Sequence, residues 1–335
     1  MTGPPRRVLV VGRDYFFYTR AICDMIAART GAEVAFVPIE PAGAAYKLMK
    51  RAGRPGARWL DRHHRRAIAE YAGFAPDLLL FIQCHQLEHR LGWYREAFAG
   101  VPFRLYYWDS LATHDYRPYL PCFETAFSFD PADCAAVPGL VHLPLFFVPE
   151  LRAARAVAEP PFDLGFVGTV VSRRRYDALE ALRRQATTQG LTLDAQLLVS
   201  PLLWLRELLA GRPLRRVRFR SIGRDEVLAS YARAAAILDV PNNSQTGFTM
   251  RTFETLGAHR KLVTTNARMA SAGFFDPAVV AVLEKGQQLP PRAWLRDGRT
   301  PGPEVEAFGL EAWLDRLLAP GTALAPASAP LKVSP

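Results

Sequence analysis

Short apolar runs alternate with segments of helical periodicity along most of this sequence. Apolar runs without polar alternation are typical of strands buried on both faces, and connections long enough to hold a helix place such strands parallel. The pattern therefore predicts an α/β fold in which helices cover a parallel sheet. In the first half, strands are expected at residues 8–11, 33–39, 77–83, 104–108, 125–129 and 141–145, and helices at 15–30, 59–71 and 87–98.

The alternation stops near the middle of the chain and then starts again. Residues 149–162 are rich in Ala, Arg and Pro and have no apolar period, which indicates a connection between domains. We expect two Rossmann-like lobes that face a cleft, at 1–155 and 156–320, and a disordered tail at 321–335. In the second half, strands are expected at 163–167, 193–199, 217–221, 236–240, 261–265 and 278–283, and helices at 175–189, 202–209, 225–235, 249–259 and 310–318.

The composition is that of a folded protein with a basic surface. Half of the residues are hydrophobic and 22% are charged, so enough apolar surface is available to form cores. The formal net charge of +10 favours anionic partners such as phosphates or a membrane surface, and a solvated basic face is the alternative. A signal peptide, an apolar run long enough to span a bilayer and a CxxC motif are all absent. A cytoplasmic protein is therefore expected.

The first candidate binding site lies at the expected turn after strand 163–167. Ligands of parallel sheets bind at the carboxyl ends of the strands, where loops and helix N-termini present free backbone N–H groups. Gly168 and Thr169 come at this point, followed by Arg173 at an expected helix start. Glycine lets the backbone approach a ligand and arginine supplies positive charge, so the turn suits a diphosphate. A helix start whose arginines are merely solvated is the alternative.

The second candidate site follows the expected strand at 236–240. The helix after it carries Arg251 and Glu254 three residues apart, so both side chains lie on one face near the helix N-terminus. Glu254 can accept hydrogen bonds from the vicinal hydroxyls of a ribose, and Arg251 can contact phosphate oxygens. A surface ion pair is the alternative. The loop before the helix is polar and contains Asn242, Gln245, Thr246 and Gly247.

Several short motifs between residues 100 and 275 are shared with a known family. They include Tyr107-Trp108-Asp109-Ser110, Phe127-Ser128-Phe129-Asp130-Pro131, Pro144-Leu145-Phe146, Ile237-Leu238-Asp239-Val240, Thr249-Met250-Arg251-Thr252 and Lys261-Leu262-Val263-Thr264-Thr265-Asn266. In these motifs the sequence resembles bacterial glycosyltransferases of the two-lobed GT-B kind, the group 1 and CgeB-like enzymes of capsule and lipopolysaccharide synthesis. The stretch at 249–266 is the most specific part of the likeness.

The resemblance implies a nucleotide-sugar donor bound by the second lobe, a glycan or lipid-linked acceptor bound by the first, and no metal or other cofactor. It places Glu254 at the nucleotide ribose. Gly247 stands seven positions before Glu254, where many such enzymes carry a second glutamate, so the stereochemistry of transfer is left open. The residues expected to bind the donor are Gly168, Thr169, Arg173, Asn242, Gln245, Thr246, Gly247, Met250, Arg251 and Glu254.

Three residues at strand ends of the first lobe are candidates for a catalytic base. Asp109 follows strand 104–108, His85 follows strand 77–83, and Asp14 follows the first strand. An inverting transfer needs such a base to take a proton from the acceptor hydroxyl. Each residue also has a structural alternative, because Asp109 and Asp14 can cap helices and His85 can be a hydrogen-bonded loop residue.

Other functions remain open on the sequence alone. A nucleotide-sugar epimerase and a two-lobed binding protein without turnover share the expected architecture. The charge also raises nucleic-acid binding, but the sequence contains no recognition motif for it, so no nucleic-acid partner is expected. The GxGxxG fingerprint, the Walker A pattern and clusters with zinc spacing are absent, which argues against dehydrogenases, ATPases and metalloenzymes. Arginines at 62–66 form a basic helix face that could contact an anionic membrane or only solvent.

Overall fold

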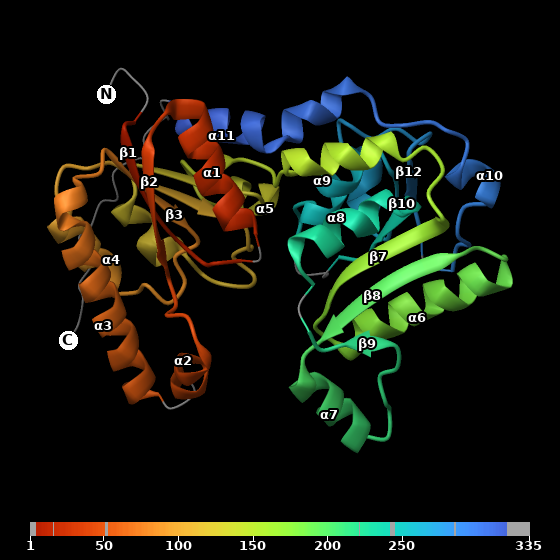
Figure 1. The fold of residues 1–335 in the computed structure, drawn as a ribbon, viewed down its shortest axis with the longest axis horizontal. Helices are drawn as coiled ribbons and strands as arrows, with labels where there is room; N and C mark the ends of the chain where they lie inside the picture. The colour runs from red at the N-terminus through yellow and green to blue at the C-terminus, as the bar shows by residue number, and fades with distance from the viewer. Residues whose placement is uncertain are drawn as a thin grey trace. The chain divides into compact units, whose positions relative to one another are not determined.

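The computed structural model describes residues 5–319 except Phe16, residues 51–52, Ser221, residues 242–244 and Lys285. Asn242 and the predicted tail at 321–335 therefore lie outside the described residues. By their contacts the described residues form two compact units, shown in Figure 1. Unit 1 contains the residues up to 144 together with 245–247 and 310–319, and unit 2 contains 145–241 and 248–309.

Unit 1 is built on a six-stranded parallel sheet with the order β2-β1-β3-β4-β5-β6. The apolar side chains of β1 and β3, two of its inner strands, are shielded from solvent, as expected where helices cover both faces of a sheet. Every strand predicted in the first half is present. The strands are β1 (Arg7–Gly12), β2 (Glu33–Pro38), β3 (Leu78–Ile82), β4 (Phe103–Tyr107), β5 (Thr125–Ser128) and β6 (Val141–His142).

The helices of unit 1 share an aromatic core with the sheet. Phe81 of β3 contacts the rings of Tyr94 and Phe103. The short helices α2 and α5 were not predicted, since six residues are too few to show an apolar period. The helical segments are α1 (Tyr18–Thr30), α2 (Ala44–Met49), α3 (Arg54–Tyr71), η2 (Ala72–Phe74), α4 (Arg90–Ala97), η3 (Arg117–Cys122), α5 (Pro131–Ala136) and α11 (Leu310–Leu318).

The last described helix, α11, packs in unit 1 beside α1, although the predicted lobe boundary groups it with the second half of the chain (Figure 1). Trp313 of α11 is buried and meets the ring of Tyr106 edge-on at 4.8 Å. Arg29 of α1 donates to the carboxylate of Asp315 at 2.6 and 2.7 Å. The sequence reveals that this helix has an apolar face to bury. Only the tertiary contacts show which core buries it.

Unit 2 repeats the architecture with a second six-stranded parallel sheet, in the order β12-β11-β10-β7-β8-β9. Phe147 donates its backbone N–H to the carbonyl of Phe308 at 3.0 Å, so the chain is already part of unit 2 before the predicted boundary near residue 155. All strands predicted for the second half are present. They are β7 (Phe162–Val170), β8 (Leu193–Val199), β9 (Val217–Arg218), β10 (Ala234–Asp239), β11 (Lys261–Thr264) and β12 (Val280–Val282).

The helices of unit 2 include all those predicted for this part of the chain, together with shorter segments. None of the helices in the described parts is long and apolar enough to cross a membrane. The helical segments are η4 (Pro149–Ala156), α6 (Arg173–Thr188), α7 (Pro201–Leu209), α8 (Arg224–Ala232), α9 (Met250–Gly257), η5 (Ala267–Ser271), α10 (Arg292–Leu295) and η6 (Pro303–Phe308).

A buried carboxylate, Asp163, ties the start of β7 to distant parts of unit 2. It accepts hydrogen bonds from the backbone N of Thr192 at 2.8 Å, from Nη2 of Arg292 at 3.1 Å and from Nε of Arg296 at 2.5 Å. Burial by itself would raise the pKa of this carboxyl, but the hydrogen bonds from Thr192 and the two guanidinium groups outweigh it and lower the pKa to about 2. Asp163 therefore stabilises the fold only while it is ionised.

This shift predicts how acid acts on unit 2. The pKa in the unfolded chain is near 3.8, so the unfolded state binds more protons as the pH falls. The contribution of Asp163 is complete above about pH 5 and is lost as the pH falls towards 2, a change of about 2 kcal/mol. In urea unfolding, the difference in stability between wild type and Asp163→Asn should shrink by about 1 kcal/mol, roughly half of this amount, between about pH 6 and pH 3. A difference that does not change with pH would contradict the assignment, and Asp225→Asn at an exposed position is the control.

Candidate functional site

Asp239, at the carboxyl end of β10, anchors the start of α9 in unit 2. Its side chain is shielded from solvent, and it accepts hydrogen bonds from the hydroxyls of Thr249 at 3.0 Å and of Thr252 at 3.3 Å. Thr249 is also the N-cap of α9, since its hydroxyl accepts the backbone N–H of Thr252. The strand end therefore fixes the position and direction of the helix N-terminus.

Arg251, in the first turn of α9, is held between Asp239 and β7. Its Nη1 lies 3.3 Å from Oδ1 of Asp239, its Nη2 donates to the carbonyl of Val167, and its guanidinium lies 4.7 Å from the centre of the Phe166 ring. Burial acts to lower the pKa of Arg251, and the neighbouring Asp239 and other acidic groups outweigh it, so the pKa lies above its usual value. The guanidinium stays charged, and its buried Nε has no hydrogen-bond partner among the described residues.

Gly168 makes this placement of Arg251 possible. A Cβ atom on Gly168 would overlap with Nη2 of Arg251, so a larger residue would displace the guanidinium. The sequence placed Gly168 and Thr169 in a turn, but β7 continues to Val170 and both are strand residues. The predicted turn is therefore wrong, and the side chain that lies against the Gly168 backbone is Arg251, whereas a contact of Gly168 with a ligand stays a prediction.

Glu254 lies one helical turn after Arg251 and is also buried. It accepts a hydrogen bond from the hydroxyl of Tyr231 of α8 at 2.6 Å. Burial and the nearby carboxylate raise the pKa of Tyr231 well above its usual value, so this phenol remains a donor. The two charged residues of α9 thus form part of a buried polar cluster, and the alternative of an exposed surface pair does not apply.

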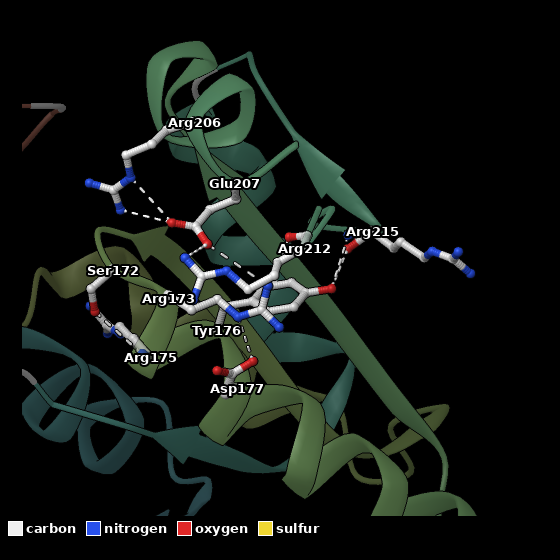
Figure 2. Close-up of polar contacts among 9 residues, drawn as sticks. All are labelled: Ser172, Arg173, Arg175, Tyr176, Asp177, Arg206, Glu207, Arg212 and Arg215. Carbon is white, nitrogen blue, oxygen red and sulfur yellow. Dashed lines mark hydrogen bonds and ion pairs between the residues drawn. The ribbon is translucent and has the colours of Figure 1, made fainter. Parts of the chain in front are cut away.

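Arg173 lies in a different environment from the one predicted. Helix α6 begins at Arg173, as expected, with Ser172 as its N-cap. The guanidinium of Arg173 donates to Asp177 and to the carbonyl of Arg212, both at 2.8 Å, so it links α6 to the loop after α7 (Figure 2). Arg175 is the arginine of this segment that lies over the Phe166 ring, at 6.0 Å, on the same ring as Arg251.

The predicted donor loop is divided between the two units. Thr246 belongs to unit 1, where its backbone N and its hydroxyl donate to the carboxylate of Asp130, the N-cap of α5. A Cβ on Gly247 would approach the ring and the carbonyl of Phe129 to 2.7 Å, so glycine is required for this contact. Gln245 also belongs to unit 1, whereas Met250 is the first residue of α9 in unit 2. Neither unit by itself contains both residues 245–247 and Glu254, so their joint role in donor binding stays a prediction.

In unit 1, Asp109 and His85 lie at the carboxyl ends of neighbouring strands. Asp109 accepts a hydrogen bond from Nε2 of Gln83, and it does not cap a helix because the next helical segment begins only at Arg117. The ring of His85 stacks on His114 at 4.9 Å. Burial, assisted by His114 and Arg13, lowers the pKa of His85 to about 4. The imidazole is therefore neutral at pH 7 and able to accept a proton.

Sequence reasoning missed several polar residues around this position. Buried polar atoms with no hydrogen-bond partner in the described parts of the chain occur at Oε1 of Gln83, Nδ1 of His85, Oε1 of Gln86 and the hydroxyl of Tyr107. Buried polar groups are normally paired, so these unpaired ones make this part of unit 1 a candidate binding site for a polar molecule. Gln83 and Gln86 also have positive φ angles of 63° and 72°, a strain typical of functional loops. No residue type in the sequence signals such angles.

Asp14, the remaining candidate base, lies at the surface. It forms an ion pair with Arg20 at 3.6 Å, and both side chains are exposed. Helix α1 begins at Tyr18 with Phe17 as its N-cap, so the structural alternative for Asp14 as a cap is also wrong. Within unit 1, the buried polar cluster thus favours His85 and Asp109 over Asp14.

Comparison with known proteins bears on the fold. No protein-family model and no curated protein matches the chain. Among solved structures, a sucrose-phosphate synthase from Thermosynechococcus elongatus has a TM-score of 0.60 at 15% identity, covering 93% of this chain and 97% of that one. A glycosyltransferase from Rickettsia africae has a TM-score of 0.55 at 8% identity, covering 96% and 100%. At these identities the likeness shows the fold alone, and it confirms the predicted α/β class with two Rossmann-like lobes of the GT-B kind.

Proposed function

We propose that this protein is a glycosyltransferase that moves a sugar from a nucleotide-sugar donor to a glycan or glycolipid of the cell surface. The observation that carries the proposal is the buried cluster of Asp239, Arg251, Glu254 and Tyr231 at the carboxyl ends of β7 and β10. Ligands of parallel sheets bind at these ends. The two similar structures carry the names of a sucrose-phosphate synthase and a glycosyltransferase, which agrees with the proposal.

In this proposal the residues of unit 2 recognise the nucleotide. Glu254 accepts hydrogen bonds from the ribose hydroxyls, while Tyr231 holds its carboxylate in place. Arg251 and the N-terminus of α9 provide positive potential for the diphosphate. Asp239 and the carbonyl of Val167 orient the Arg251 guanidinium, so little ordering is needed when the donor binds. No metal or other cofactor is part of the proposed reaction.

Unit 1 is proposed to bind the acceptor. The unpaired polar atoms of Gln83, Gln86 and Tyr107 suit the hydroxyl groups of a sugar. Asp109, with His85 as the alternative, is proposed to take the proton from the acceptor hydroxyl. The lowered pKa of His85 keeps its imidazole neutral at pH 7 but also makes it a weaker base. Arg58, Arg62 and Arg65 line a cavity of about 520 Å³ with Trp59, and this basic face suits an acceptor at an anionic membrane.

Nucleotide titration tests the donor assignment. Uridine, guanosine, adenosine and thymidine diphosphates would be titrated calorimetrically against wild type and Glu254→Gln. We expect at least one of these nucleotides to bind wild type. The variant should bind the same nucleotide at least about tenfold more weakly, since hydrogen bonds to a charged group contribute about 1.5–3 kcal/mol. Wild type should bind the 2′,3′-dideoxy form of that nucleotide more weakly than the parent nucleotide by a similar factor. The variant should bind the two forms with equal affinity.

The matched control is Tyr231→Phe, which removes the hydrogen bond that Glu254 accepts from this phenol but keeps the carboxylate. Its nucleotide affinity should stay within about threefold of wild type even if its stability falls as much as that of Glu254→Gln. Equal losses in the two variants, or full affinity in Glu254→Gln, would remove the ribose assignment. Donor hydrolysis or nucleotide release with a panel of nucleotide sugars distinguishes a transferase from a binding protein without turnover.

A further inference from the structure

Helix α7 presents leucine side chains to solvent on one face. Leu202, Leu205 and Leu209 are 59%, 46% and 80% exposed, and Leu208 is also exposed. Their spacing places them along a single stripe of the helix. Phe219, which follows β9, is half exposed and meets the ring of Trp204 edge-on at 5.7 Å, so it extends the same apolar surface. We call this surface of Leu202, Leu205, Leu208, Leu209 and Phe219 the α7 patch.

The opposite face of α7 packs against the rest of unit 2, so the helix cannot rotate to bury these leucines. Leu203 is buried, and Glu207 is only 1% exposed four residues later on the same face. The Glu207 carboxylate lies between guanidinium groups: Arg206 at 3.0 Å, Arg212 at 3.2 Å and Arg173 at 3.9 Å (Figure 2). The patch is therefore a fixed outer surface of the fold.

The charge around the α7 patch is strongly positive. Residues 201–220 contain six arginines and one acidic residue, the buried Glu207, a net charge of +5 (6 − 1). Arg206, Arg212 and Arg220 have side chains that are 67%, 57% and 82% exposed. Contiguous apolar surface of this kind is unusual on a monomer and indicates an interaction site. Because arginines accompany the α7 patch, its partner is expected to carry negative charge next to an apolar region.

We propose that the α7 patch docks on an anionic phospholipid bilayer, with the leucines in the upper acyl region and the arginines among the lipid phosphates. A bilayer accepts both parts at once, because arginine side chains extend to the headgroups while their neighbours enter the apolar layer. An apolar groove of a protein would instead desolvate the guanidinium groups without pairing their charge, which is unfavourable. This proposal does not depend on the nucleotide site, and it assigns to unit 2 a membrane contact distinct from the basic face of unit 1.

Vesicle cosedimentation tests the proposal with the intact protein. We expect wild type to bind vesicles of phosphatidylglycerol mixed with phosphatidylcholine, and to bind phosphatidylcholine alone at least about tenfold more weakly. Leu205→Asp and Leu209→Asp should each reduce binding to the anionic vesicles by about tenfold or more, because each removes a leucine that would enter the acyl region and adds a charge that the lipid phosphates repel. Arg220→Ser should weaken binding to anionic vesicles only, by about fivefold.

The matched control is Ala181→Asp, which adds the same charge at an exposed position of α6 and leaves the patch intact. Its binding should fall less than that of either leucine variant, and all variants should keep the wild-type unfolding midpoint. Absence of wild-type binding, unchanged binding in both leucine variants, or equal binding to neutral vesicles would each overturn the proposal. So would a wild-type dimer in sedimentation velocity that the leucine variants convert to monomer without any vesicle binding, since the patch would then be a self-association surface.

Discussion

Replacing Asp239 by asparagine is expected to lower the free energy of unfolding by about 3–5 kcal/mol, since removing one partner of a buried ion pair leaves an uncompensated charge. Asp239 accepts hydrogen bonds from Thr249, Thr252 and Thr264 as well as from Arg251. An asparagine amide presents a donor where one of these oxygens accepts. Chemical unfolding monitored by circular dichroism measures the change, and nucleotide binding should be lost as well because Arg251 is no longer held.

A second substitution distinguishes loss of the charge pair from loss of packing. In Asp239→Asn/Arg251→Met no buried guanidinium remains, and we expect about half or more of the lost stability to return. Nucleotide binding should remain absent, because the proposed phosphate ligand is gone. If the double variant is less stable than Asp239→Asn alone, the interaction between Asp239 and Arg251 does not account for the first result.

Trp313→Ala is expected to destabilise unit 1 by about 3–5 kcal/mol, the usual cost of truncating a buried tryptophan. Trp313 is 1% exposed and packs edge-on against Tyr106 of β4. Although Trp313 follows all of unit 2 in the sequence, the loss should occur in the sheet of unit 1. Native-state hydrogen exchange measured by mass spectrometry should show weaker protection in peptides from β1, β3 and β4, with little change in β7 and β10.

Trp294→Ala in unit 2 is the matched control. Its ring lies over Lys261 at 4.1 Å, and its Nε1 donates to the carbonyl of Pro277. Here the loss of protection should fall on β11 and β12 instead. If Trp313→Ala weakens the strands of unit 2 and leaves those of unit 1 unchanged, the placement of α11 in unit 1 is wrong.

The elements that the sequence predicted are those whose signal is local. Every predicted strand is present because an uninterrupted apolar run has few stable alternatives to the inside of a sheet. Arg251 and Glu254 were singled out because their spacing on a helix and their place after a strand are both readable from the sequence. Asp239 was missed as a site residue, although the same rule applies to it, since it is the polar residue that ends β10.

The remaining features depend on contacts between residues far apart in the chain. Arg173 and Arg175 point to different sides of α6, and only the folded structure shows that Arg175 faces the Phe166 ring while Arg173 bonds the carbonyl of Arg212 after α7. Thr246 precedes α9 by few residues, but its hydrogen bonds go to Asp130 in unit 1. By residue type, the leucines of α7 are expected in a core and Glu207 at the surface. In the structure most of these leucines are exposed and Glu207 is buried.

The sequence by itself determined the α/β class, the division into two Rossmann-like lobes and the strand ends at which a ligand is expected, because apolar periodicity acts over a few neighbouring residues. The tertiary structure decided which core α11 joins, which side chains meet at those strand ends, and which apolar face is left in solvent. These outcomes depend on which surfaces remain after the sheets have formed. Local patterns in a chain carry no information about that pairing.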